Sequence, residues 1–212
     1  MTTIGVLALQ GAFMEHVRKL RRIGVDVREV RLPAEIEGLD GLIIPGGEST
    51  TIGKLIERFN MRDDLLALVR SGRPVWGTCA GMILMGRDVV EESRASDQPL
   101  LGVLDVSVRR NAFGSQLDSF ETDLDVPMLG SDPLPVVFIR APVVESVGPD
   151  VEVLARLDDG RIVAVRQGNL VATAFHPELT DDDRFHIWFV ELAEQPSDTE
   201  EDLAGIGATQ IG

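Results

Sequence analysis

The sequence predicts an α/β fold built on an open, mostly parallel sheet with helices on both faces, in three layers, and with antiparallel strands added at its edge. In the first half, short unbroken apolar runs alternate with segments of helical periodicity. In the second half, the apolar runs are shorter and are separated by turn residues typical of hairpins. Strand and helix alternation in the first half favours right-handed β-α-β crossovers.

The first predicted strand and helix follow directly from hydrophobic spacing. Residues 4–9 form a continuous apolar run, as expected for a strand buried on both faces. Apolar side chains then recur at helical spacing over residues 12–23, and Gly24 ends that helix. The same reasoning predicts strands over residues 25–30, 41–44 and 73–76, and helices over residues 49–59 and 61–70.

The turn residues of the second half predict antiparallel strands added to the edge of the sheet, and we expect the loops between these strands to extend toward the active site. Turn residues occur at Asn111, at residues 158–160 and at residues 167–169. A final helix is expected over residues 182–192, with three aspartates at its N-terminus.

Length and composition indicate one globular domain, which we place at residues 1–194. Residues 195–212 are acidic and poor in apolar side chains, so we expect a disordered tail there. The single cysteine, the absence of a signal-peptide pattern and the lack of a long apolar stretch favour a cytoplasmic protein with no membrane contact. A formal net charge of −15 argues against nucleic-acid binding.

The single cysteine, Cys79, has the sequence surroundings of a nucleophile. It lies in the motif Trp76-Gly77-Thr78-Cys79-Ala80-Gly81, after one apolar run and before another. Glycines two residues before and after it permit the sharp strand-to-helix turn that presents a nucleophile, and the helix start favours a thiolate. A buried structural cysteine is the alternative.

Two further residues complete a possible triad. His176 is followed two residues later by Glu178, and in an extended segment these two side chains point the same way. Glu178 is then expected to fix the tautomer of His176, which faces Cys79 as the general base. The other two histidines, His16 and His186, lie in predicted helices and are expected to be packing or surface groups.

Glycines at the end of the third predicted strand offer backbone donors for a ligand. The motif Pro45-Gly46-Gly47-Glu48-Ser49-Thr50 joins that strand to a helix, and Gln10 ends the first strand at the same sheet edge. The motifs of phosphate-binding loops and dinucleotide sites are absent, and no metal-ligand spacing occurs. We therefore expect neither a cofactor nor a metal.

Together these residues resemble the class I glutamine amidotransferases, which have a flavodoxin-like three-layer fold. Within that group the chain is similar to the glutaminase subunit of pyridoxal 5′-phosphate synthase. The resemblance covers residues 4 to about 192 and leaves the acidic tail outside it. It rests on six segments: residues 4–13, 45–51, 76–82, 110–114, 138–142 and 174–179.

This resemblance implies a function and a set of residues. The chain would hydrolyse L-glutamine to glutamate and ammonia through Cys79, His176 and Glu178, and pass the ammonia to a barrel-shaped synthase subunit in a heteromeric complex. The resemblance also implies that L-glutamine is held by Gly47, Glu48, Ser49, Arg110, Ile139 and Arg140. The oxyanion hole would comprise Gly46, Gly47 and Ala80, and Gln10 would organise that region when the synthase docks.

Three other interpretations remain open on the sequence alone. In the first, the chain serves a different synthase, such as imidazole glycerol phosphate synthase, with the same triad. In the second, it is an elbow-cysteine protein of another kind, such as a peptidase. In the third, it is a non-catalytic subunit that only senses glutamine or scaffolds a partner.

Overall fold

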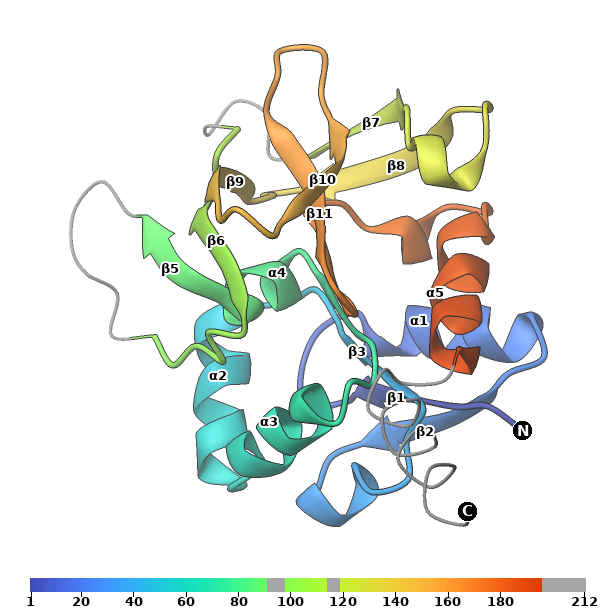
Figure 1. The fold of residues 1–212 in the computed structure, drawn as a ribbon, viewed down its shortest axis with the longest axis vertical. Coiled ribbons are helices and arrows are strands. Elements are labelled where there is room, and N and C mark those ends of the chain that lie inside the picture. Colours follow the sequence, from blue (N-terminus) through green and yellow to red (C-terminus); the bar gives the residue numbers. More distant parts are fainter. Residues whose placement is uncertain (91–97, 114–118, 196–212) are drawn as a thin grey trace, which may run out of the picture.

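The computed structural model describes residues 1–90, 98–113 and 119–195 (Figure 1). The predicted acidic tail lies outside the described residues, apart from Gln195. In the described part of the chain, no helix has the length and apolar character needed to cross a membrane.

The predicted parallel sheet is present and forms the centre of the molecule. Its strands are β1 (Thr3–Leu7), β2 (Asp26–Val30), β3 (Gly41–Ile44), β4 (Val75–Thr78) and β12 (Leu170–Thr173). They lie in the order β2-β1-β3-β4-β12, and every neighbouring pair is parallel. Because all five strands run in the same direction, their carboxyl ends lie along the same edge of the sheet.

The antiparallel strands extend the sheet beyond β12, as predicted for the second half. They are β6 (Leu104–Arg109), β9 (Val143–Val147), β10 (Glu152–Arg156) and β11 (Ile162–Gln167). The order continues β12-β11-β9-β6, and β10 pairs with β11. The turns near residues 158–160 and 168–169 are hairpins, since each joins antiparallel neighbours.

Three details differ from the sequence-based prediction. The chain re-enters the sheet directly after the elbow as β5 (Gly86–Val90), which pairs parallel to β6 at the outer edge. The strands β7 (Ser119–Leu124) and β8 (Leu134–Ile139) form a separate two-stranded sheet instead of joining the main edge. The third difference is β12, which lies inside the sheet because its other neighbour is β4.

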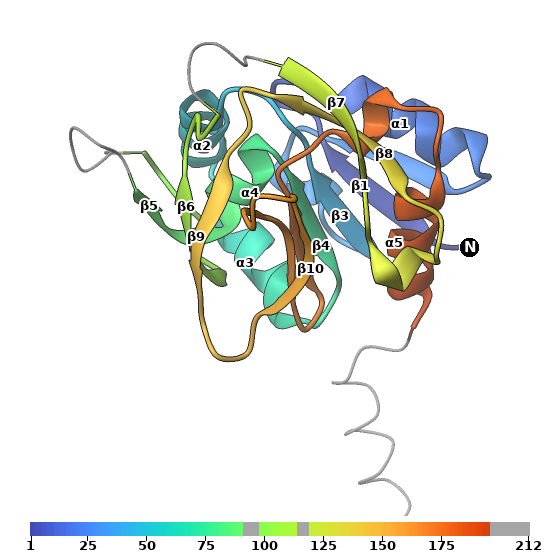
Figure 2. The same ribbon diagram turned by 90° about the horizontal axis from the view of Figure 1, so that it is seen from above.

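Helices cover both faces of the sheet (Figures 1 and 2). The helices α1 (Phe13–Arg22) and α5 (Arg184–Glu194) lie on one face, where Phe185 stacks on Trp76 of β4 at 4.7 Å between ring centroids. The helices α2 (Ser49–Arg58), α3 (Arg62–Arg70) and α4 (Ala80–Met85) lie on the other face. Short 3-10 turns occur at Pro33–Glu35 (η1), Pro127–Leu129 (η2) and Pro177–Leu179 (η3).

Candidate active site

A pocket of about 330 Å³ opens at the carboxyl ends of the parallel strands, where ligands collect in open α/β sheets. It brings together eleven residues singled out from the sequence: Gln10, Gly46, Gly47, Glu48, Ser49, Cys79, Ala80, Arg110, Ile139, Arg140 and His176. Three further residues line it: Ala12, Ile83 and Asn111. Glu178 is not in the lining, because it lies behind His176.

Cys79 occupies a strained backbone position between β4 and α4. Its φ of 48° is in the left-handed region, which residues with a side chain rarely adopt. The flanking glycines make the turn possible: a Cβ on Gly81 would lie 2.1 Å from the carbonyl oxygen of Ile44, and one on Gly77 would lie 2.5 Å from the carbonyl carbon of Gly81. The main-chain amide of Cys79 also donates to Thr173 O at 2.7 Å, which joins the turn to β12.

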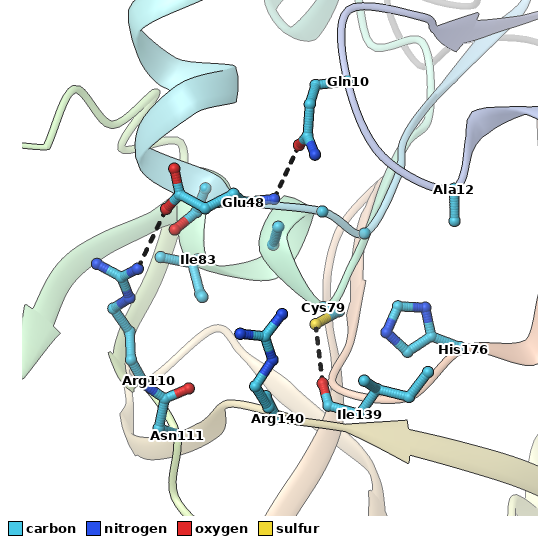
Figure 3. Close-up of a pocket in the computed structure, with 14 residues that line it drawn as sticks. Gln10, Ala12, Glu48, Cys79, Ile83, Arg110, Asn111, Ile139, Arg140 and His176 are labelled. Carbon is cyan, nitrogen blue, oxygen red and sulfur yellow. Dashed lines mark hydrogen bonds and ion pairs between the residues drawn. The ribbon is translucent and has the colours of Figure 1, made fainter. Parts of the chain in front are cut away.

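His176 lies beside Cys79 on the wall of the pocket (Figure 3). Both side chains converge on Gly46, since a Cβ there would lie 2.4 Å from His176 Cε1 and 3.4 Å from Cys79 Cβ. The backbone of His176 is anchored to the second sheet, because its amide donates to Val137 O at 2.8 Å. A glycine at position 46 is therefore what allows the thiol and the imidazole to approach.

Glu178 holds His176 from behind. His176 Nδ1 donates to Glu178 Oε1 at 2.7 Å, and both residues are buried. Burial alone would lower the pKa of His176, but the interactions with Cys79 and Glu178 outweigh it and raise that pKa to about 10. Burial works against the charge on Glu178, yet the neighbouring His16 and His176 keep its pKa below the ordinary value. The arrangement therefore favours an imidazolium next to a carboxylate.

The glycine loop after β3 is tied to the loop after β1. Gly46 O accepts from the amide of Ala12 at 2.9 Å, and the amide of Glu48 donates to Gln10 Oε1 at 2.8 Å. The two loops pass so closely that a Cβ on Gly47 would lie 2.5 Å from Gln10 Oε1. Gln10 thus contacts the glycine loop directly.

Charged side chains form the opposite wall (Figure 3). Glu48 caps α2 by accepting from the amides of Thr50 and Thr51. Its partial burial would raise the pKa of Glu48, but hydrogen bonds from Thr51 and Thr50 outweigh that effect and lower it to about 2. Arg110 reaches the same carboxylate at 3.4 Å, and Arg140 extends into the pocket from the end of β8 with a φ of 41°.

Sequence reasoning missed three residues that support this site. Gln98 Oε1 accepts from Ser49 and contacts Arg110 at 3.3 Å. Asn111 lines the pocket from a turn with a φ of 48°. His16 was expected to be a packing or surface group; it is buried as a packing group would be, but it also lies 3.4 Å from Glu178. The contacts of Gln98 with Ser49 and of His16 with Glu178 have no local sequence signature, because each joins segments that are far apart in the chain. At Asn111 the sequence indicates the turn but not its place in the pocket.

Comparison with known proteins identifies the family. The model of the SNO glutamine amidotransferase family matches residues 6–195. The chain belongs to the SNO glutamine amidotransferase family.

Relatives of high identity are named as subunits of one enzyme. "Pyridoxal 5′-phosphate synthase subunit PdxT" of Herpetosiphon aurantiacus is 58% identical over 190 residues, which cover 90% of this chain and all of the relative. The protein of the same name from Roseiflexus sp. (strain RS-1) is also 58% identical, with the same coverage.

Two solved structures are similar to this chain. A crystal structure described as a glutamine amidotransferase is 51% identical, and the match covers 91% of this chain and 99% of the other, with a TM-score of 0.84. The structure of PurLQS from Thermotoga maritima contains a chain that shares the fold, at 16% identity and a TM-score of 0.63. That match covers 90% of this chain and 98% of the other.

Proposed function

We propose that this chain hydrolyses L-glutamine to L-glutamate and ammonia as the glutaminase subunit of a pyridoxal 5′-phosphate synthase. The observation that carries this proposal is the convergence of Cys79, on its strained turn, with His176 and Glu178 in one pocket. A nucleophile, a base and an orienting carboxylate are the groups that covalent acyl transfer requires. The proposal is supported by membership of a glutamine amidotransferase family.

The reaction begins with the Cys79 thiolate, which attacks the side-chain amide carbon of glutamine. The imidazolium of His176 gives its proton to the departing nitrogen, which leaves as ammonia, and a γ-glutamyl thioester remains on Cys79. Neutral His176 then takes a proton from water, and the resulting hydroxide attacks the thioester carbonyl. The C–S bond breaks, glutamate leaves and the thiolate is restored. Throughout, Glu178 keeps Nδ1 of His176 protonated, so that Nε2 faces the reacting atoms.

Backbone amides supply the oxyanion hole in this proposal. Ala80 is the first residue of α4, and amides in the first turn of a helix have no carbonyl partner within it. The second donor comes from Gly46 or Gly47, whose loop lines the same pocket as Ala80. Removing one such donor typically costs on the order of 10²-fold in rate. Gln10 holds the amide of Glu48 and so sets the course of this loop.

The remaining polar lining suits the amino-acid end of glutamine. Arg110 and Arg140 present guanidinium groups that match a carboxylate, and Glu48 is an anion facing the same space. Backbone groups of Gly47, Ser49 and Ile139 complete the contacts. We expect Arg110→Ala to raise KM for glutamine, with a smaller effect on kcat.

The partner in this proposal is a barrel-shaped synthase subunit that accepts the ammonia in a heteromeric complex. This assignment rests on relatives named as pyridoxal 5′-phosphate synthase subunits. Those names also weigh against a subunit of imidazole glycerol phosphate synthase. A single cysteine cannot form an internal disulfide and fits a reducing compartment, so we place the complex in the cytoplasm.

The test is glutamate release from L-glutamine by the purified chain, alone and mixed with the synthase subunit. We expect the partner to stimulate release, and Cys79→Ala to abolish it while thermal melting and complex formation stay unchanged. Glutamate release that the synthase subunit does not stimulate would support glutaminase activity but contradict the proposed partner. Absence of glutamate release by the wild-type complex would favour a non-catalytic binding subunit.

A further inference from the structure

A line of buried polar groups continues the proposed triad away from the pocket. Behind Glu178 lie His16 of α1 and His186 of α5, both fully buried on the face of the sheet opposite α2. Trp76 packs its indole against both imidazoles, with ring centroids 5.6 Å and 5.0 Å away. Burying a histidine costs free energy unless its ring nitrogens form hydrogen bonds, so the partners of these two imidazoles are informative.

The distances connect the two histidines to the catalytic carboxylate. His16 Nδ1 lies 2.9 Å from His186 Nε2. His16 Nε2 lies 3.4 Å from Glu178 Oε2 and 3.3 Å from the hydroxyl of Thr78. Within the described part of the chain, Glu178 Oε2 has no hydrogen bond of standard geometry. His16 therefore offers a donor to the oxygen of Glu178 that His176 does not use.

One assignment of the two ring protons suits these groups best, although Nδ1 of His186 has no partner among the described residues in any assignment. If His16 carries its proton on Nε2, it donates toward Glu178 and Thr78, and its Nδ1 accepts from Nε2–H of His186. The reverse assignment would turn a lone pair of His16 toward an anionic carboxylate. It would also leave a buried N–H on Nδ1 of His186, which has no partner among the described residues.

Both rings are neutral in this environment. Burial is the main effect that lowers the pKa of His16, opposed by Glu178 and aided by His176 and Lys19, with a smaller opposing effect of Glu15. Burial likewise lowers the pKa of His186 well below its ordinary value, with His16, Lys19 and Arg22 adding to the effect. A neutral imidazole with its proton on Nε2 can donate to Glu178 without neutralising its charge.

We propose that His16 is a positioning residue of the site, which holds the second oxygen of Glu178 and thereby sets the orientation of His176, while His186 fixes the tautomer of His16. This inference rests on the proposed glutaminase function. Glu178 is then held from two sides, by His176 from the pocket and by His16 from α1, and cannot rotate away from the imidazole. A carboxylate fixed in this way keeps the geometry that the proton transfers require.

The experiment compares three variants in the complex with the synthase subunit. His16→Met replaces the imidazole and its N–H donor with an apolar side chain of similar length. His16→Gln restores an N–H near the position of Nε2. His186→Met is the comparison variant: it also replaces a buried histidine beside Trp76, but it removes the group that fixes the tautomer of His16 and not the side chain that contacts Glu178.

We expect His16→Met to lower kcat for glutamine about tenfold or more with KM within roughly twofold, because a misplaced catalytic group affects the chemical step. The acidic limb of the kcat/KM profile moves to higher pH, since Glu178 without its donor is harder to ionise. His16→Gln recovers most of both effects, and His186→Met loses less activity. Full activity of His16→Met, or equal losses in the Met and Gln variants at position 16, would overturn the inference.

A second measurement needs no substitution. With three histidines in the sequence, the tautomer of each can be followed by ¹⁵N NMR of imidazole-labelled chain between pH 6 and 9. His16 is expected as the neutral Nε2–H form throughout, and an Nδ1–H form would overturn the inference even if the variants do not fold. Absence of glutamate release by the wild-type complex would reject the proposed function, whereas the NMR result concerns His16 alone.

Discussion

At the scale of single residues, the site depends on backbone positions that favour glycine. Cys79 adopts a φ of 48°, and Gly46 leaves room that any larger residue would take from His176. Strain of this kind costs about 1–3 kcal/mol and persists where the surrounding structure imposes it. The sequence indicated the tight turn and the glycine loop because their signals are local. These signals are the glycines on either side of Cys79 and the Gly46-Gly47 pair.

The pairing of His176 with Glu178 predicts a particular pH dependence. The raised pKa of His176, about 10, contributes stability that is fully present below the unfolded value of 6.5 and is lost as pH rises through about 10. In Glu178→Gln the anionic partner is gone, so the pKa of His176 falls and the basic limb of kcat/KM moves to lower pH. We expect kcat to fall on the order of 10²-fold or more.

The matched control for this substitution is Glu191→Gln on the exposed surface of α5. Glu191→Gln should leave kcat unchanged, together with the acidic and basic limbs of the pH profile of kcat/KM. A basic limb at the same pH in Glu178→Gln and in the wild type would contradict the role given to the carboxylate.

At the scale of elements, close backbone approach fixes the elbow against the neighbouring strand. Helix α4 begins directly after Cys79 and passes β3 so closely that Gly81 touches the carbonyl of Ile44. The length of α4 and the strand β5 after it escaped prediction. The apolar run beyond Cys79 gives no sign of where a short helix turns into a strand. The position of β12 beside β4 was not predicted either, because pairing between distant segments leaves no local pattern in the sequence.

This contact predicts an unequal cost of two alanine substitutions. In Gly81→Ala the new Cβ meets a backbone oxygen at 2.1 Å, so the elbow and β3 must separate. We expect a loss of about 3 kcal/mol or more in the free energy of unfolding, in the upper range of overpacking effects. Gly86→Ala is the control, since its φ of −59° suits any residue and its nearest neighbour is a side-chain methyl of Val108 at 3.1 Å.

Urea unfolding midpoints of the two variants measure this difference. Gly86→Ala should stay within about 1 kcal/mol of the wild type. Equal midpoints for the two variants would show that the approach of α4 to β3 is not a tight constraint.

At the scale of the whole molecule, the fold joins segments from both ends of the chain behind the site. Helix α1 near the N-terminus and α5 near the end of the described residues meet over Trp76, and η3 carries Glu178 between them. Much of the pocket lining was predictable from strand ends and glycine loops that are visible in the sequence, whereas Arg110, Ile139 and Arg140 were expected there only from the resemblance to a known family. The contact of His16 with Glu178 was not predictable, because the two residues are far apart in the sequence. In the sequence, α1 and α5 look like ordinary amphipathic helices, so nothing marks their buried histidines.

The buried histidines predict that acid destabilises the whole domain before its carboxylates titrate. His16 and His186 stay neutral in the folded state, whereas their unfolded forms bind protons below about pH 6.5. The unfolded state then holds more protons, so the free energy of unfolding falls as pH drops below 6.5, by up to about 1.4 kcal/mol per pH unit for each histidine. His176 acts in the opposite direction at and above pH 6.5, where its unfolded form is only partly protonated, and it adds no slope once the pH is well below 6.5, where it is protonated in both states.

Urea unfolding at pH 7.5, 6.5 and 5.5 tests this linkage. His186→Phe should show a shallower loss of stability between pH 6.5 and 5.5 than the wild type. An identical slope in the two proteins would mean that His186 is not a neutral buried group in the folded state.

The most direct test of the central claim is covalent trapping of the nucleophile. The chain in complex with its synthase subunit is treated with 6-diazo-5-oxo-L-norleucine, a glutamine analogue whose diazoketone replaces the side-chain amide, and the modified peptide is located by mass spectrometry. Our account predicts one label per chain on Cys79, prevented by excess L-glutamine and slowed in His176→Ala. Labelling at another residue, or labelling of Cys79 that L-glutamine does not prevent, would contradict it.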